Sequence, residues 1–273
     1  MHAGRYWGGG ALALAALMIA SGGALAQREG DEAQSSCERG WGRSDRPRHC
    51  EVRESGRRAE GGTIVVEPGQ NGGASIEGWD RDSVHVRAEI QAQARTEEDA
   101  RKLTGEVRIV SSGGRISAEG PPNRSGASWS VSFVINLPRR SNLSIEAHNG
   151  PIKVEGVAGH MRLRTQNGPI ALAAVGGDVR ARAQNGPITV RLTGTRWDGE
   201  GLDAETQNGP LVLDVPDDYN AQLETGTVNG PMTIDFPITV SGRLGRRIST
   251  QLGEGGRPVR AVTTNGPVIV RRR

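Results

Sequence analysis

Residues 161–173 read MRLRTQNGPIALA, and residues 179–191 repeat the pattern as VRARAQNGPITVR. In both stretches, apolar or small residues recur at every second position on either side of the tripeptide Asn-Gly-Pro. The tripeptide occurs six times, beginning at Asn149, Asn167, Asn185, Asn208, Asn229 and Asn265. Self-similarity at a nearly fixed period is the signature of a repeat protein, in which one small unit stacks on copies of itself.

Alternation with a period of two predicts a half-buried β-strand on each side of every tripeptide. Asn tolerates left-handed backbone and Gly adopts positive φ without steric cost, so Asn-Gly predicts a tight corner, after which Pro begins the next strand. The Asn residues given above and the glycines that follow them are therefore expected to be structural corners and not ligand-binding residues. These glycines are Gly150, Gly168, Gly186, Gly209, Gly230 and Gly266.

The spacing of the corners favours an all-β, repetitive β-solenoid with about two strands per coil. Successive corners are 18, 18, 23, 21 and 36 residues apart, and the extra residues fall at 194–201 and 237–256, away from Asn-Gly. A solenoid accepts such insertions at one corner without disturbing the stack. The alternative is an antiparallel meander, because Asn-Gly is also a strong hairpin signal, but a meander needs a second layer to cover its apolar face.

The residues before the regular repeats carry a degenerate form of the same pattern. Strands are expected at 63–67, 73–77, 84–94, 106–111, 115–118 and 128–137. Asn71-Gly72-Gly73 resembles a degenerate Asn-Gly corner. Thr96 followed by three acidic residues predicts a capped helix near 97–104. The expected organisation is a signal peptide at 1–26, a polar cysteine-containing segment at 27–60, a degenerate β part at 61–140 and the regular repeats at 141–273 of the same domain.

The first residues and the cysteines indicate the compartment. Arg5, an apolar stretch at 11–20 and Ala24-Leu25-Ala26 are typical of a secretory signal peptide, and the apolar stretch is too short to span a membrane. The mature chain is expected in the periplasm, in the medium or at the cell surface, without a transmembrane segment. In an exported chain, Cys37 and Cys50 predict a disulfide. A metal site using His49 beside Cys50 is the alternative, but it lacks a fourth ligand at a familiar spacing.

The sequence contains no motif for catalysis, cofactor binding or metal binding. There is no Gly-x-Ser-x-Gly elbow, phosphate loop or His-Glu-x-x-His, and the histidines are scattered. The formal net charge of +3 argues against a general nucleic-acid binder. We therefore expect no catalytic residues, no cofactor, no metal and no nucleic-acid partner.

An enzyme is the alternative class. Polysaccharide-cleaving β-helices place carboxylates on the outer face of successive coils, where two act as acid and base. If coils stack in sequence order, Asp214 and Asp235 are neighbours about 5 Å apart by strand spacing. A solvated outer face, with Arg191 offsetting Asp214, is the simpler interpretation.

Four arginines are the candidate ligand-binding residues. They occupy the outward positions five and three residues before Asn167 and Asn185, and in-register stacking brings them together on two neighbouring coils. They are Arg162, Arg164, Arg180 and Arg182. Phosphate, sulfate or carboxylate groups of an envelope polymer match the donor geometry of arginine. Asp203, Glu205 and Glu146 on adjacent coils could neutralise part of the charge.

The repeated Thr-x-Asn-Gly-Pro-(Ile/Val)-x-(Val/Leu) motif, the exported N-terminus and the segment Gly253-Glu254-Gly255-Gly256 resemble the bacterial putative-adhesin family of exported β-strand-repeat proteins, a domain-of-unknown-function family. The resemblance covers roughly residues 60–271. It implies a β-solenoid-like envelope protein with no catalytic residues to carry over. The sequence thus predicts a non-enzymatic binding, adhesin-like or structural module, with a carbohydrate-active enzyme or an envelope-stress sensory domain as alternatives and self-association through the solenoid ends as a further expectation.

Overall fold

The computed structural model describes Cys37, residues 46–236 and residues 246–273. The chain separates into a unit at Met1–Gly40 and a unit at Trp41–Arg273, and the fold below is that of the second unit. The predicted signal peptide at 1–26 lies outside the described residues.

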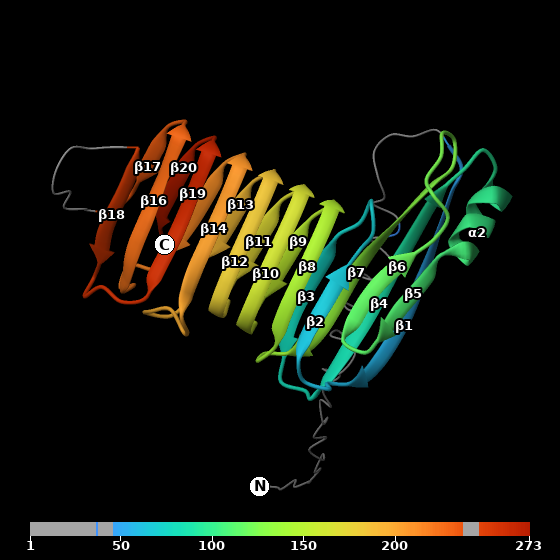
Figure 1. Cartoon of the computed structure of the whole chain (residues 1–273), viewed down its shortest axis with the longest axis horizontal. Coiled ribbons are helices and arrows are strands. Elements are labelled where there is room, and N and C mark those ends of the chain that lie inside the picture. Colours follow the sequence, from blue (N-terminus) through green and yellow to red (C-terminus); the bar gives the residue numbers. More distant parts are fainter. Residues whose placement is uncertain (1–36, 38–45, 237–245) are drawn as a thin grey trace, which may run out of the picture. The chain divides into compact units, whose positions relative to one another are not determined.

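Two ten-stranded sheets lie face to face in this unit (Figure 1). The first sheet has the order β1 (Arg48–Arg58), β4 (Ser83–Gln93), β7 (Ser128–Pro138), β3 (Ala74–Trp79), β9 (Ile152–Glu155), β11 (Ile170–Ala173), β13 (Ile188–Arg191), β15 (Leu211–Val215), β20 (Val268–Arg272) and β17 (Met232–Ile234). The second sheet has the order β18 (Arg247–Leu252), β16 (Ala221–Asn229), β19 (Pro258–Asn265), β14 (Gly201–Asn208), β12 (Gly176–Asn185), β10 (Ala158–Asn167), β8 (Asn142–Asn149), β2 (Thr63–Glu67), β6 (Arg115–Glu119) and β5 (Arg108–Ser112).

Each regular coil consists of one strand of the second sheet, an Asn-Gly-Pro corner and one strand of the first sheet. Neighbouring coils pair in parallel, as in β10 with β12 and β11 with β13. Antiparallel pairs occur only towards the ends of the sheets, where β1, β4 and β7, β5 and β6, and β16 and β18 meet, among the described strands. The solenoid prediction is therefore confirmed, and the meander is wrong.

The alternating columns of the repeat form one aliphatic core between the sheets. In the coil of β10 and β11, Met161, Leu163, Ile170 and Leu172 are each at most 2% exposed. The inward columns are buried in every regular coil except the one formed by β16 and β17, where Met232 and Ile234 are half-buried. Because both sheets supply side chains to the same core, no further layer is needed to cover it.

The corner asparagines do not adopt the left-handed backbone that the sequence suggested. No corner Asn has positive φ; among the described residues that are not glycine, only Ala174 does, at 50°. Each Asn still pairs as the last residue of its strand, as Asn167 does with Asn185, and the chain bends at the glycine. Glycine is required there by contact between coils: a Cβ on any of the six corner glycines comes within 2.0–2.4 Å of a carbonyl oxygen of the neighbouring coil.

The corner asparagines form a continuous hydrogen-bonded ladder. Each side-chain Nδ2 after Asn71 donates to the Oδ1 of the preceding Asn in the stack, at 2.8–3.0 Å. In spatial order, this asparagine ladder contains Asn71, Asn149, Asn167, Asn185, Asn208, Asn265 and Asn229. The degenerate corner at Asn71 is therefore hydrogen-bonded into the stack as the regular corners are.

The coils do not follow the order of the sequence at the C-terminal end of the stack. Strand β19 lies between β14 and β16, and β20 lies between β15 and β17. Residues 258–272 thus form an interior coil, and the coil of β16 and β17 lies beyond it. Stacking in sequence order, which we expected, is wrong for these last two coils.

The N-terminal part contains the predicted strands with small shifts of their ends. Helix α2 (Glu97–Glu106) is also present, and the Thr96 side chain accepts a hydrogen bond from the Asp99 N–H at 3.0 Å. The helix packs on β1 and β4. Strand β1 was not predicted, because its sequence RHCEVRESGRR is polar at most positions; its partner β4 supplies the apolar residues of this pair.

Replacement of Leu172 by Asp should unfold neighbouring coils. The side chain is 2% exposed, so the variant buries an unpaired carboxylate in the aliphatic core. We expect a loss of more than about 3 kcal/mol in the free energy of unfolding in urea. Ala171→Asp on the outer face of the same strand is the control and should stay within about 0.5 kcal/mol; equal losses in both variants would refute the inside–outside assignment.

Replacement of Gly168 by Ala tests the contact between corners. Its Cβ would lie 2.2 Å from the Gly150 oxygen, although the backbone itself permits alanine. A loss of about 2–3 kcal/mol is expected from thermal or urea unfolding. The control is Gly105→Ala in α2, where a Cβ meets nothing within 4 Å; it should be neutral or stabilise by up to about 1 kcal/mol.

Candidate functional site

The four predicted arginines lie together on the outer face of the second sheet. Arg162 and Arg164 on β10 are in register with Arg180 and Arg182 on β12. Their neighbours along each strand are buried, which directs the arginines to the solvent side. We call these four residues the arginine surface.

The two strands of the arginine surface differ in how their charges are compensated. Arg182 forms an ion pair with Asp203 and lies 3.8 Å from a Glu205 oxygen. Arg180 has a looser contact of 3.7 Å, from its Nε to Asp178. Arg162 and Arg164 are exposed, and neither has an ion pair or side-chain hydrogen bond among the described residues. Positive charge without an ion-pair partner therefore concentrates on β10, where Glu146 of β8 is the carboxylate in register with Arg164.

Sequence reasoning missed the role of Arg260. Because β19 lies next to β14, the Arg260 Nη1 reaches Asp203 at 2.6 Å and Glu205 at 3.1 Å, and its Nε lies 3.5 Å from Glu224. Stacking in sequence order would place Asp203 beside Glu224 with no cation between them. The inserted coil thus separates like charges on the two strands that flank it.

The same interleaving overturns the proposed carboxylate pair. On the first sheet, Asp214 is in register with Arg271 of β20. Asp235 lies on the far side of that strand, where its N–H donates to the Val270 carbonyl at 3.0 Å. Asp214 and Asp235 are therefore not adjacent, and the catalytic pair predicted for the enzyme alternative does not exist in this form.

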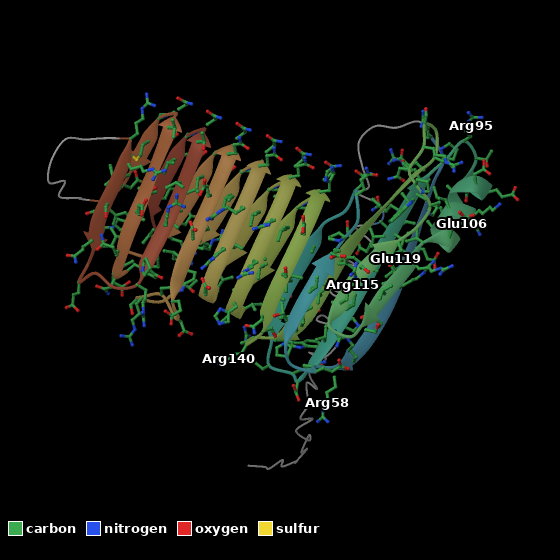
Figure 2. All side chains as sticks on the ribbon, in the orientation of Figure 1. Arg58, Arg95, Glu106, Arg115, Glu119 and Arg140 are labelled. Atoms are coloured by element: carbon green, nitrogen blue, oxygen red, sulfur yellow. The ribbon has the colours of Figure 1, made fainter. Side chains whose placement is uncertain are left out.

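The arginine surface borders a groove of about 770 Å³ that runs across six neighbouring strands, from β2 to β19. We call it the amide groove, because glutamines in register line it between Arg164, Arg182 and the corners. These are Gln166, Gln184 and Gln207. Glu67 and Glu146 lie at one end, and Glu67 is paired at 2.5 Å with Arg115, which Figure 2 labels on β6.

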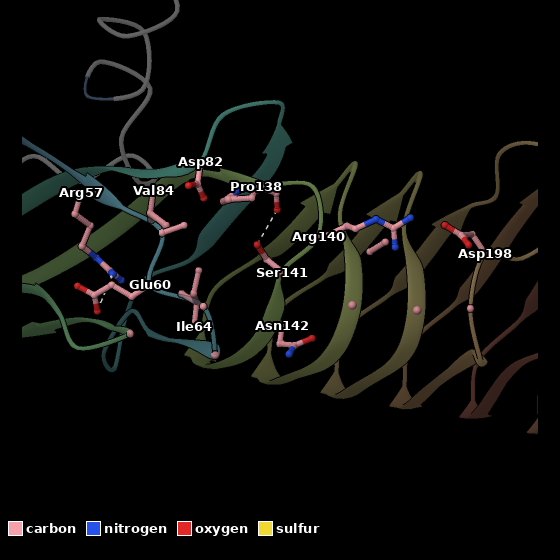
Figure 3. A pocket seen from close by; sticks show the side chains of 18 residues that line it. Arg57, Glu60, Ile64, Asp82, Val84, Pro138, Arg140, Ser141, Asn142 and Asp198 are labelled. Carbon is pink, nitrogen blue, oxygen red and sulfur yellow. Dashed lines mark hydrogen bonds and ion pairs between the residues drawn. The ribbon is translucent and has the colours of Figure 1, made fainter.

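A second cavity, of about 440 Å³, lies at the opposite corner of the coils. Its lining combines Arg57 and Arg140 with Glu60, Asp82 and Asp198. Figure 3 shows Arg140 directed towards Asp198, whereas Arg57 lies with Glu60 at the other end, where Nη1 is 3.8 Å from the Glu60 carboxylate. This cavity contains side chains of both charges, so it lacks the concentrated positive charge of the arginine surface.

The cysteines are both disulfide-bonded, as predicted. The alternative metal site is wrong, because a disulfide leaves no thiolate ligand and His49 Nδ1 instead lies 2.8 Å from the Thr104 hydroxyl. Within the described parts of the chain, no group of three or more His, Cys, Asp or Glu is placed to hold a metal ion. No helix there is long and apolar enough to cross a membrane.

Acidification should weaken the ion pairs around Asp203. Partial burial raises the pKa of this carboxyl, but hydrogen bonds from Arg182 and Arg260 outweigh that effect and hold the pKa below its ordinary value. A lowered pKa stabilises the fold above the unfolded-state value of about 3.9, and this contribution is lost as the pH falls through the folded-state pKa.

We therefore expect Arg260→Gln to lower the free energy of unfolding at pH 7 by about 1 kcal/mol, since these pairs are partly exposed. The difference in the free energy of unfolding between the variant and the unmodified chain should become smaller between pH 4 and pH 2. Urea titrations at each pH measure this difference. Arg191→Gln, an exposed arginine of the first sheet, is the control. A difference that stays constant down to pH 2 would contradict the assigned role of Arg260.

More than half of the chain matches a known protein family. A protein-family model described as Toastrack DUF4097 matches residues 105–271. No curated protein matches the chain.

Solved bacterial structures resemble the chain at low identity. One from Clostridium sporogenes, named a putative cell adhesion protein, has 9% identity and a TM-score of 0.37, with 82% of this chain and 100% of that chain covered. A putative adhesin from Bacteroides fragilis has 7% identity and a TM-score of 0.37, covering 82% and 97%. A putative adhesin from Parabacteroides merdae has 12% identity and a TM-score of 0.34, covering 81% and 96%.

Proposed function

The chain belongs to the Toastrack DUF4097 family, and we propose that it is an exported, non-enzymatic binding module of the bacterial cell envelope. The ligand is an anionic surface polymer, and the arginine surface holds it. The observation that carries the proposal is the pair of exposed, uncompensated guanidinium groups of Arg162 and Arg164 beside two further arginines in register.

Electrostatics favours an anion at this place. Adjacent strands are about 4.8 Å apart, and two like charges about 5 Å apart repel by about 3 kcal/mol at an effective dielectric constant of about 20. Long side chains spread apart to reduce this repulsion, and an anion between them removes it. Guanidinium groups bind carboxylate, sulfate and phosphate through paired N–H donors.

The fold supports binding of an extended ligand. Parallel coils place outward residues in register at every strand spacing, so the outer face aligns the arginine donors of the two neighbouring coils β10 and β12. The disulfide supports an exported protein, because such bonds persist in oxidising compartments. The signal-like residues before Gln27 support the same compartment.

Replacement of Arg162 and Arg164 together by Gln should weaken binding to isolated envelope fractions roughly 10- to 100-fold, because each charged hydrogen bond contributes about 1.5–3 kcal/mol before screening. Co-sedimentation of the mature chain across a salt series measures both the affinity and its salt dependence, which should become shallower in the variant.

The matched control removes two exposed arginines from the first sheet, Arg191→Gln with Arg271→Gln. It keeps the same net charge as the test variant and should bind as the unmodified chain does. If both double variants lose binding equally, net charge and not the arginine surface determines it. Unchanged binding by the Arg162 and Arg164 variant would end the proposal.

A further inference from the structure

The glutamine row of the amide groove differs from the asparagine ladder beside it. The asparagine amides are hydrogen-bonded to one another at 2.8–3.0 Å. Gln166, Gln184 and Gln207 occupy the preceding position of three successive coils and are exposed. None of these three amides has a hydrogen bond among the described residues. They present unused donors and acceptors at one strand spacing, about 4.8 Å.

The charges in the groove are arranged in blocks along the stack. Arg164 and Arg182 lie in its middle, with Glu146 on the neighbouring strand to one side and Glu205 on the neighbouring strand to the other. A polymer carrying only anionic acceptors meets repulsion from Glu146, which has no ion pair among the described residues, and weaker repulsion from Glu205, which Arg260 partly neutralises. A polymer with hydroxyl groups as well can donate to these carboxylates and to the glutamine oxygens while its acidic groups face the arginines.

From this arrangement we propose that the amide groove binds an acidic polysaccharide whose chain lies along the solenoid axis, across β10, β12 and β14. Gln166, Gln184 and Gln207 are the residues that contact successive sugar hydroxyls, and Arg164 and Arg182 contact the acidic groups. The inference rests on the proposed function, since it uses two residues of the arginine surface, and it adds the direction of the chain, its chemistry and three further contact residues.

The groove has the dimensions for such a chain. Its volume of about 770 Å³ falls in the range of ligand sites, and its lining crosses six adjacent strands. A ligand lying along the strands would contact a single coil, whereas one lying along the axis meets a glutamine on each of three successive coils and an arginine on two of them. Affinity must therefore rise with the number of sugar residues until the three glutamine-bearing coils are spanned.

The test measures binding of galacturonate oligomers of one to six residues by titration calorimetry at low salt. We expect the hexamer to bind at least about tenfold more tightly than the monomer. The triple variant Gln166→Ala, Gln184→Ala and Gln207→Ala should lose about tenfold in affinity for the hexamer, through loss of several neutral hydrogen bonds. Its affinity for the monomer should stay within about twofold, because the arginines remain.

Matched controls separate this effect from altered folding. Gln93→Ala with Gln222→Ala removes amides outside the groove and should leave the affinity for the hexamer unchanged. Thermal unfolding of the triple variant should match that of the unmodified chain, because its three replaced side chains are exposed. The control variant replaces half-buried glutamines, one of which donates to the Ser249 hydroxyl, so any change in its unfolding is measured beside its affinity.

Other outcomes distinguish the inference from the proposed function. Equal affinity for monomer and hexamer, or a triple variant that binds the hexamer normally, overturns the inference. Polyphosphate, a polymer without hydroxyl groups, is the second probe. If it binds through Arg162 and Arg164 at least as well as the hexamer, the anion-binding function stands and the polysaccharide inference fails. If neither polymer binds, both fail.

Discussion

The contact between corners constrains everything else in this solenoid. Each corner places a glycine against the carbonyl of the neighbouring coil, at a separation that excludes a Cβ, and each Asn amide donates to the one beside it. The two contacts fix the register of successive coils at one point. Since side chains alternate strictly along a strand, a fixed point at the corner sets which residues face the core and which form rows on the surface. The aligned arginines and glutamines are a consequence of that register.

The corner contacts do not determine the order of the coils, because every coil offers the same corner. The charges on the outer faces of the sheets favour one order of the coils. On the second sheet, Arg260 lies between Asp203 and Glu224, and on the first, Arg271 follows Asp214. Exchanging the last two coils would bring carboxylates together on both outer faces. The charges on both outer faces therefore favour the observed order of the coils, although each partly exposed ion pair contributes only modestly to stability.

Much of this structure could be predicted from the sequence because it repeats. Period-two alternation around Asn149 or Asn185 predicts strands, burial and parallel stacking without knowledge of distant contacts. The order of the last two coils could not be predicted in this way, since the repeats at Asn229 and Asn265 fit either place equally well. The charges of Arg260 and Arg271 are the sequence feature that favours the observed order. They become informative when the outward residues of successive repeats are compared for the sign of their charge. Strand β1 was missed because its burial depends on β4 and α2 and not on its own pattern.

The same reasoning explains how much of the candidate site was foreseen. The register of Arg162 with Arg180 follows directly from the repeat, whereas the compensation of Arg182 by Asp203 depends on side-chain reach across strands. The glutamine row was visible in the sequence as the residue before each corner. It was overlooked because a single exposed Gln carries no meaning, and only the contrast between hydrogen-bonded asparagines and unpaired glutamines distinguishes the two rows.

The interior position of residues 258–272 has a consequence for biogenesis. A ribosome makes these residues after the strands on both sides of them, so the stack cannot grow one coil at a time as the chain emerges. Before β19 and β20 have been synthesised, the coil of β16 and β17 pairs only with β18 among the described strands and lacks its neighbour on the side of the stack. Completion of the core is thus deferred until β19 and β20 have been synthesised. Proteolytic loss of residues 258–272 would therefore remove an interior coil. It would separate the coil of β16 and β17 from the rest of the stack, instead of shortening the stack by one repeat.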